Sequence, residues 1–154
     1  FAEGVTFVAT ANIGNEYTST RVMDKALMDR FIIVEMDVLN DEEEFGLLQY
    51  MFPNVSASLL QAVSEISHLS RTEAKLDSGK LSTGISTRTS VEMAGLLVDG
   101  FGLDEAAEVT IYPQYVDDGV DSERTFVKQL VQKYINDGSD ENLFNEKVEE
   151  YEVS

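Results

Sequence analysis

The first candidate for chemistry is Asn12, an amide that directly follows a short apolar run. Residues 5–11 are rich in β-branched and apolar side chains, and Gly14 follows soon after them. This pattern predicts a buried strand that stops at a turn. Ligands of open α/β sheets bind at the carboxyl ends of strands, so Asn12 could orient a water molecule or contact a phosphate. The alternative is an asparagine that only makes the turn before Gly14.

The second candidate is Arg30, which ends a short predicted helix that begins near Met23. Residues 31–36 are apolar and predict a second buried strand. Arg30 could reach past the edge of its domain, with Asp29 holding the guanidinium in one orientation by a charge-assisted hydrogen bond. The alternative is a surface ion pair, which stabilises a protein little.

The third candidate is Arg88, in the segment Ser86-Thr87-Arg88-Thr89. Ser86 or Thr87 predicts the N-cap of an amphipathic helix, which puts Arg88 in the first turn. The helix dipole disfavours a cation there, by a few tenths of a kcal/mol up to about 1 kcal/mol. An arginine kept against this preference indicates a partner such as an anion. The alternative is an exposed arginine whose hydrocarbon stem covers apolar surface.

Together and in this order, the three segments resemble the sensor 1, arginine-finger and sensor 2 motifs of AAA+ ATPases. They are residues 8–12 (VATAN), 26–31 (ALMDRF) and 86–88 (STR). The resemblance is strongest to the MoxR and dynein-related group, which includes the nitric-oxide-reductase and Rubisco activators and the ATPase subunit of cobaltochelatase. The first and third segments look most like the cobaltochelatase subunit. The resemblance covers about residues 4–135.

The resemblance implies a role for each candidate residue. Asn12 would position the attacking water, and Arg30 would reach into the ATP site of the neighbouring subunit. Arg88 would contact the nucleotide phosphates, either of its own subunit or, because some relatives have a displaced lid, of a neighbour. Thr10 and Arg21 are candidates for accessory roles, Arg21 at the subunit interface.

The resemblance also implies ATP and Mg²⁺ as cofactors of the intact protein, and a ring-shaped oligomer that we expect to be a hexamer. The activity would be ATP-driven remodelling, as a metal chelatase of the cobaltochelatase type or as a MoxR-type activator. The partner would be a protein client or a subunit with a von Willebrand A-type domain. The rival hypothesis is a non-enzymatic, lid-like helical adaptor or interaction module.

A phosphate-binding loop is missing from the sequence. This loop needs G-x-x-x-x-G-K-[ST], because backbone amides wrap the phosphates, the lysine reaches them and the hydroxyl holds Mg²⁺. The nearest string, Gly79-Lys80, continues with Leu81 and has Ala74 in place of the first glycine. Residues 32–37 imitate a Walker B strand, but in the family Walker B precedes sensor 1. We therefore interpret the chain as the C-terminal half of an ATPase subunit.

Composition argues against several other classes of function. With 11 Lys and Arg against 29 Asp and Glu, the formal net charge is −18, which repels nucleic acids and anionic membranes. The sequence has no cysteine and one histidine, His68, so we expect no metal site of these ligands. No apolar run reaches the roughly 18–20 residues of a membrane span, and we expect a cytoplasmic location. Because Phe1 leads at once into an apolar run, we expect the sequence to start inside a longer protein or at a boundary chosen for expression.

The remaining pattern predicts a mostly α fold with a small α/β remnant. Residues 1–39 would be the end of the αβα AAA+ core, residues 40–136 a helical lid domain with sensor 2, and residues 137–154 an acidic tail. We expect five helices in the lid. The first is capped by Asp41 and stopped by Pro53, and the second runs from Ser56 to about Ala74, with an apolar face formed by Leu59, Leu60, Val63, Ile66 and Leu69. The third runs from Ser86 or Thr87 to Gly100, the fourth covers residues 104–109, and the fifth is capped by Asp121 or Ser122.

Because the phosphate-binding loop is missing, we predict that this chain alone does not hydrolyse ATP. Phosphate release by the purified chain should equal that of an Asn12→Ala/Arg30→Ala double variant. Turnover clearly above that of the variant would contradict the prediction.

Overall fold

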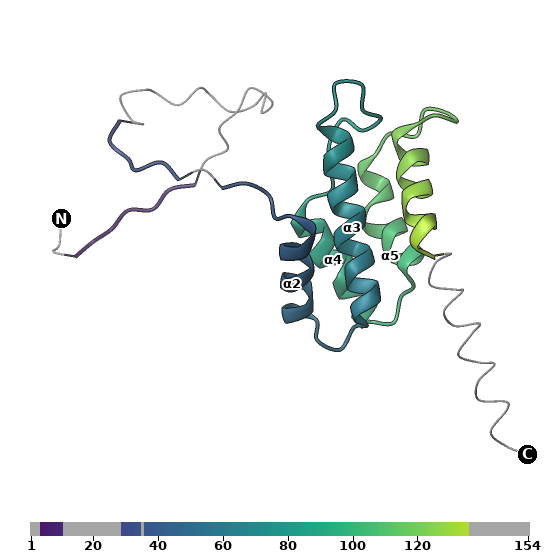
Figure 1. Cartoon of the computed structure of the whole chain (residues 1–154), viewed down its shortest axis with the longest axis horizontal. Coiled ribbons are helices and arrows are strands. Elements are labelled where there is room, and N and C mark those ends of the chain that lie inside the picture. Colours follow the sequence, from purple (N-terminus) through teal and green to yellow (C-terminus); the bar gives the residue numbers. More distant parts are fainter. Residues whose placement is uncertain (1–3, 11–28, 35, 136–154) are drawn as a thin grey trace, which may run out of the picture. The chain divides into compact units, whose positions relative to one another are not determined.

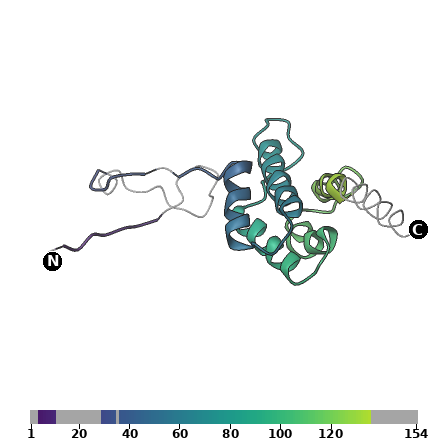
Figure 2. The same ribbon diagram turned by 60° about the horizontal axis from the view of Figure 1, so that its bottom comes forward.

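The computed structural model describes residues 4–10, 29–34 and 36–135 of the chain. The chain divides into two compact units, Phe1–Asp37 and Val38–Ser154. Every helix that the structure describes lies in the second unit, which Figures 1 and 2 show from two directions. The predominantly helical fold expected from the sequence is therefore confirmed.

The second unit is a bundle of short helices. They are α2 (Asp41–Met51), α3 (Ala57–Ala74), α4 (Thr87–Val98), α5 (Leu103–Thr110), the short 3₁₀ helix η1 (Tyr112–Gln114) and the helical residues 123–135. In the part of the chain that the structure describes, no helix combines the length and the apolar character needed to cross a membrane.

Hydrogen-bonding side chains fix where the helices begin. Ser56 caps α3, which therefore starts where the sequence predicts, and of the two predicted caps of α4, Ser86 and Thr87, the structure uses Ser86. The cap of α2 is Asn40 and not Asp41: Oδ1 of Asn40 accepts from the N–H of Glu43 at 2.8 Å, and Oε2 of Glu43 accepts from the N–H of Asn40 at 3.1 Å. This capping box pairs Asn40 with the acid at the third helical position, so α2 begins at Asp41, one residue earlier than a cap at Asp41 would give.

Glycine ends α4 at the predicted position. Gly100 has φ +90°, a left-handed conformation that residues with a side chain rarely adopt. Its N–H donates to the carbonyl of Leu97, and the N–H of Phe101 donates to the carbonyl of Leu96, both at 3.2 Å. These two bonds form a Schellman motif, which satisfies carbonyls that the end of a helix would otherwise leave open.

The core lies where α2, α3, α4 and α5 pack against one another. Figure 1 shows α2 beside α3, and α3 and α4 also pack together. Burying each large aliphatic side chain contributes about 1.5–3 kcal/mol. The core residues are Leu48, Leu60, Ala62, Val63, Ile66, Leu81, Ile85, Met93, Ala94, Leu97, Leu103, Ala106, Ala107, Ile111, Tyr112, Tyr115, Val127 and Val131.

The buried face of α3 differs from the predicted apolar stripe. Leu59 and Leu69 are 37% and 39% exposed, whereas Ser67 and Ser70 are fully buried. The hydroxyl of Ser67 shares a hydrogen bond of 2.7 Å with that of Ser90 in α4. Small side chains let α3 and α4 approach closely, and the hydroxyls satisfy each other, so burying them is tolerated.

A buried ion pair joins α2 to α3. Nη1 and Nη2 of Arg71 lie 2.6 Å and 3.0 Å from the two carboxylate oxygens of Glu44. The other three N–H donors of the guanidinium reach the carbonyls of Ile85 (2.6 Å) and Leu39 (3.0 Å) and the hydroxyl of Thr87 (3.5 Å). All five donors thus have an acceptor, the condition under which a buried charge is tolerated.

The two predicted strands are not formed in the described residues of the first unit. Residues 4–10 and 31–34 have no regular secondary structure, and Phe7 and Ile32 are 65% and 95% exposed. A strand is stable when a neighbouring strand takes its hydrogen bonds and a second layer covers one face. No such ladder occurs among the described residues of this unit, so an apolar sequence alone does not make a strand here.

Several predictions fall outside the described residues. Asn12, Arg21 and the helix expected from Met23 lie within residues 11–28, and the expected acidic tail is residues 137–154. These predictions remain as stated from the sequence.

The ion pair of α2 and α3 leads to a stability prediction. Glu44→Ala leaves the buried guanidinium of Arg71 without its counter-ion, which should lower the free energy of unfolding by about 3–5 kcal/mol. Urea denaturation of the chain, followed by circular dichroism, measures this change.

The matched control is Glu42→Ala, which removes an exposed carboxylate from the same helical turn. It loses only a favourable interaction with the helix dipole, so we expect a change below about 1 kcal/mol. Equal losses in the two variants would show that the buried pair has no special role.

Candidate functional site

Arg88 lies in the first turn of α4, and its side chain is exposed. Among the residues that the structure describes, no hydrogen bond or ion pair to its guanidinium is found. Glu92, one turn further along α4, is also exposed but lies beyond ion-pair distance of Arg88. The charge of Arg88 is therefore available to a partner.

The hydroxyls beside Arg88 are all used within the bundle. Ser86 Oγ accepts from the N–H of Thr89 at 3.2 Å and so caps the helix. Thr87 accepts from the buried guanidinium of α3, and Thr89 accepts from Nε2 of Gln114 at 3.1 Å. In the segment from Ser86 to Thr89, Ser86 and Arg88 are exposed, and Arg88 is the one whose side chain forms no hydrogen bond to the described residues.

The backbone of this turn adds to the positive potential. The first N–H groups of a helix have no acceptor inside the helix, and the helix dipole is positive there. In the described part of the chain, the N–H groups of Thr87 and Arg88 form no hydrogen bond. Two amides and one guanidinium at a helix N-terminus form an arrangement suited to a phosphate.

The loop before α4 is held from the side of α3. Ser70 Oγ accepts from the N–H of Ile85 at 2.9 Å, and Nε of Arg71 donates to the carbonyl of Ile85. A Cβ on Gly84 would lie 2.6 Å from Cα of Arg71, closer than real Cβ contacts. The loop thus packs directly on the backbone of α3, which fixes the start of α4.

The other side of the same loop is held by the C-terminal part of the bundle. The hydroxyl of Tyr115 donates to the carbonyl of Thr83 at 3.1 Å, and Oε1 of Glu123 accepts from the N–H of Ser82 at 2.5 Å. Burial, together with the charge of Glu123, raises the pKa of Tyr115 to about 12. Hydrogen bonds from the side chain and backbone of Ser82 lower the pKa of Glu123. At neutral pH, Tyr115 therefore remains a donor and Glu123 an ionised acceptor.

The other candidates lie in the first unit or outside the described residues. Thr10 and Arg30 lie in the first unit, where both are exposed and Arg30 occupies a turn. Asn12 and Arg21 lie outside the described residues. The roles that the resemblance implies for these four residues stay predictions.

Comparison with known proteins places this arrangement in a family. Residues 53–134 match the family model described as CbbQ/NirQ/NorQ C-terminal. The chain belongs to this family. The domain that this family describes is the C-terminal part of MoxR-like AAA+ ATPases and forms their helical lid. The resemblance seen in the sequence is therefore confirmed at the level of the family.

A relative supports the same family. The chain is 32% identical over 110 residues to a protein named "Putative chaperone BssE" from Thauera aromatica. The alignment covers 71% of this chain but 36% of the relative, so the chain spans about a third of that protein's length. The activity of a whole ATPase subunit is therefore a proposal for this chain.

Gly79 and Lys80 form part of a loop of the lid, not a phosphate cradle. A Cβ on Gly79 would lie 2.0 Å from the carbonyl oxygen of Glu73, so glycine is required by close packing. The N–H of Lys80 donates to Oε1 of Glu73 at 2.9 Å. These groups are used inside the lid.

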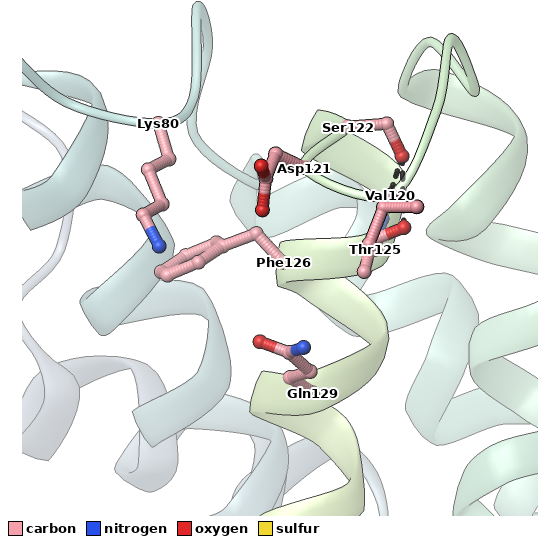
Figure 3. Close-up of a pocket in the computed structure, with 7 residues that line it drawn as sticks. All are labelled: Lys80, Val120, Asp121, Ser122, Thr125, Phe126 and Gln129. Atoms are coloured by element: carbon pink, nitrogen blue, oxygen red, sulfur yellow. Dashed lines mark hydrogen bonds between the residues drawn. The ribbon is translucent and has the colours of Figure 1, made fainter.

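A hollow beside Lys80 is too small for a nucleotide. Its volume is about 20 Å³, little more than one water molecule occupies, and Figure 3 shows the Lys80 ammonium beside the ring of Phe126, whose centroid is 5.5 Å away. Small-molecule sites usually measure about 300–1,000 Å³. Ser122 and Thr125, which also line the hollow, hydrogen-bond to each other at the start of the last described helix.

Sequence reasoning missed the two residues that support the start of α4, Arg71 and Glu44. A signal for them exists in the helical register. Arg71 follows Val63 and Ser67 at spacings of four on the buried face of α3, and Glu44 precedes the buried Leu48 by four. Opposite charges at core positions of neighbouring helices predict a buried pair.

The geometry of Arg88 leads to a prediction for the full-length protein. Arg88→Ala should weaken the affinity for ATP by about ten- to a hundredfold, the value of a hydrogen bond to a charged group. The lid should stay folded, because Arg88 makes no contact that holds the bundle. Titration with a fluorescent ATP analogue measures the affinity.

Lys75→Ala is the control for net charge, because Lys75 is an exposed cation of the lid at the C-terminal end of α3. The Lys75→Ala variant should bind ATP with the affinity of the wild type. If Arg88→Ala and Lys75→Ala bind ATP alike, Arg88 does not contact the nucleotide.

Proposed function

We propose that this chain provides the nucleotide-sensing lid of an AAA+ ATPase subunit, with Arg88 contacting the phosphates of ATP. One observation carries the proposal. Arg88 is exposed beside two amides without acceptors, while the hydroxyls on both sides of it are bound within the lid.

The charge of the chain supports this assignment. A net charge of −18 repels a nucleotide, so a fixed cation is needed where phosphates approach. Arginine suits this task, because its planar guanidinium can donate two parallel hydrogen bonds to one phosphate. The bundle holds the first turn of α4 from both sides, so Arg88 is presented on a rigid element.

The ATP site would also require Mg²⁺. When bound, this ion neutralises the negative charge that develops on the phosphates during phosphoryl transfer. In the described ranges, no group of three acidic or histidine side chains could hold a metal ion. We assign no Mg²⁺ ligand to these residues, and the lid acts on the phosphates alone.

The first unit completes the proposal. We assign residues 1–39 to the end of the AAA+ core, residues 40–136 to the lid and residues 137–154 to an acidic tail. Asn12 would position the attacking water, and Arg30 would act as the arginine finger in the ATP site of the neighbouring subunit. The support for these roles is the order and spacing of the motifs, now within a family of AAA+ ATPases.

The whole protein would couple ATP hydrolysis to the remodelling of a client protein, as a ring that we propose is a hexamer. The relative from Thauera aromatica is named as a chaperone, which supports remodelling as the activity class. Metal chelation of the cobaltochelatase type and MoxR-type activation are two forms that this activity could take. A von Willebrand A-type partner subunit belongs to the same proposal.

The role of Arg30 can be tested by mixing subunits. Arg30→Ala should preserve ATP binding but abolish turnover, because an arginine finger is worth about 10³–10⁵ in rate in related phosphoryl-transfer enzymes. Mixing this variant with subunits that lack the lysine of the phosphate-binding loop should restore ATPase activity. Competent sites form wherever an intact phosphate-binding loop faces an intact Arg30.

Subunit exchange, measured by energy transfer between labelled subunits, is the control. A mixture that exchanges but stays inactive would show that Arg30 does not act in trans. Arg30 would then be a residue that stabilises the fold by its charge.

A further inference from the structure

Arg71 connects two parts of the lid that are far apart in the sequence. On one side its guanidinium bonds to the carbonyl of Leu39 and to the carboxylate of Glu44, at the start of α2. On the other side it bonds to the carbonyl of Ile85 and the hydroxyl of Thr87, which flank the cap of α4. One rigid planar group thus bridges the entry to the lid and the turn that carries Arg88.

The bridge is close-packed as well as fully bonded. Arg71 is only 7% exposed and Glu44 is 0% exposed. Gly84 lies so close to the backbone of Arg71 that a Cβ there would need something to shift. Protein interiors packed in this way do not deform continuously, so a movement of Leu39 would be passed to the carbonyl of Ile85.

We propose that Arg71 is a positioning residue for nucleotide binding, which sets the place of Arg88 relative to the start of the lid. The proposal rests on the proposed contact of Arg88 with phosphate. Thr87, which Arg71 contacts from inside the bundle, immediately precedes Arg88, whose side chain is on the outside. An error of about 1 Å in a positioned group can reduce activity about a hundredfold, so this support matters for function.

A purely structural role must be distinguished from a positioning role. Removing Arg71 alone leaves Glu44 buried and unpaired, and the loss of folding would hide any other effect. The double variant Glu44→Met/Arg71→Met removes both charges while keeping similar volumes. Replacing a buried ion pair by apolar residues is often neutral for stability.

The experiment uses the full-length protein that contains this chain and a fluorescent ATP analogue. Unfolding midpoints in urea are measured for each variant beside the affinity. We expect Glu44→Met/Arg71→Met to stay folded but to bind the analogue about tenfold or more weakly, because Arg88 is no longer held in place. In an Arg88→Ala background, the same double substitution should change the affinity by less than about twofold.

Arg71→Lys keeps the charge beside Glu44 but has three donors in place of five. If Glu44→Met/Arg71→Met does not fold, Arg71→Lys replaces it, and its affinity is measured with and without Arg88→Ala. We expect it to bind the analogue more weakly than the wild type although the charge is kept. A role that needs only the charge predicts wild-type affinity.

The outcomes separate this inference from the proposed function. If Arg88→Ala weakens binding but the folded Arg71 variants bind like the wild type, the positioning role is wrong and the role of Arg88 stands. The positioning role is also wrong if the Arg71 substitutions weaken binding of the analogue equally in the wild-type and in the Arg88→Ala background. If Arg88→Ala itself binds normally, the proposed function is the part that fails.

Discussion

The guanidinium of Arg71, paired with the carboxylate of Glu44, is the buried interaction that joins the starts of α2 and α4 in the lid. A guanidinium and a carboxylate taken out of water cost several kcal/mol each, and only complete hydrogen bonding offsets that cost. Here each guanidinium N–H has an acceptor, and these acceptors come from the start of α2 and from the start of α4. The pair therefore selects one arrangement of α2, α3 and α4, which aliphatic packing alone would define less sharply.

The same arrangement explains why one arginine is inside the lid and another is outside. Arg71 is bonded in full and supports the first turn of α4, whereas Arg88 stands on the outer side of that turn with its charge exposed. Ser86 caps the helix and leaves the amides of Thr87 and Arg88 open. Packing and capping thus leave a helix start that is suited to an anion, and we propose that within this AAA+ family the anion is ATP.

The sequence was sufficient for the helices of the lid and for the place of Arg88 in the first turn of α4, because caps, glycines and apolar periodicity are local signals. It was insufficient for Arg71, whose importance comes from contacts 14 to 32 residues away in the chain. It was wrong about strands at residues 5–10 and 31–34, because strands need hydrogen-bond partners that an apolar pattern does not supply. Exposed Leu59 and buried Ser67 show the same limit within a helix, since neighbouring helices decide which face is covered.

We propose that the lid presents Arg88 to the phosphates of ATP. The most direct measurement is an electron cryo-microscopy structure of the full-length protein with Mg²⁺ and a non-hydrolysable ATP analogue. We predict a nitrogen of the Arg88 guanidinium about 2.7–3.2 Å from a phosphate oxygen, of its own subunit or of a neighbour. An ordered nucleotide whose phosphates are far from every copy of Arg88 would contradict it.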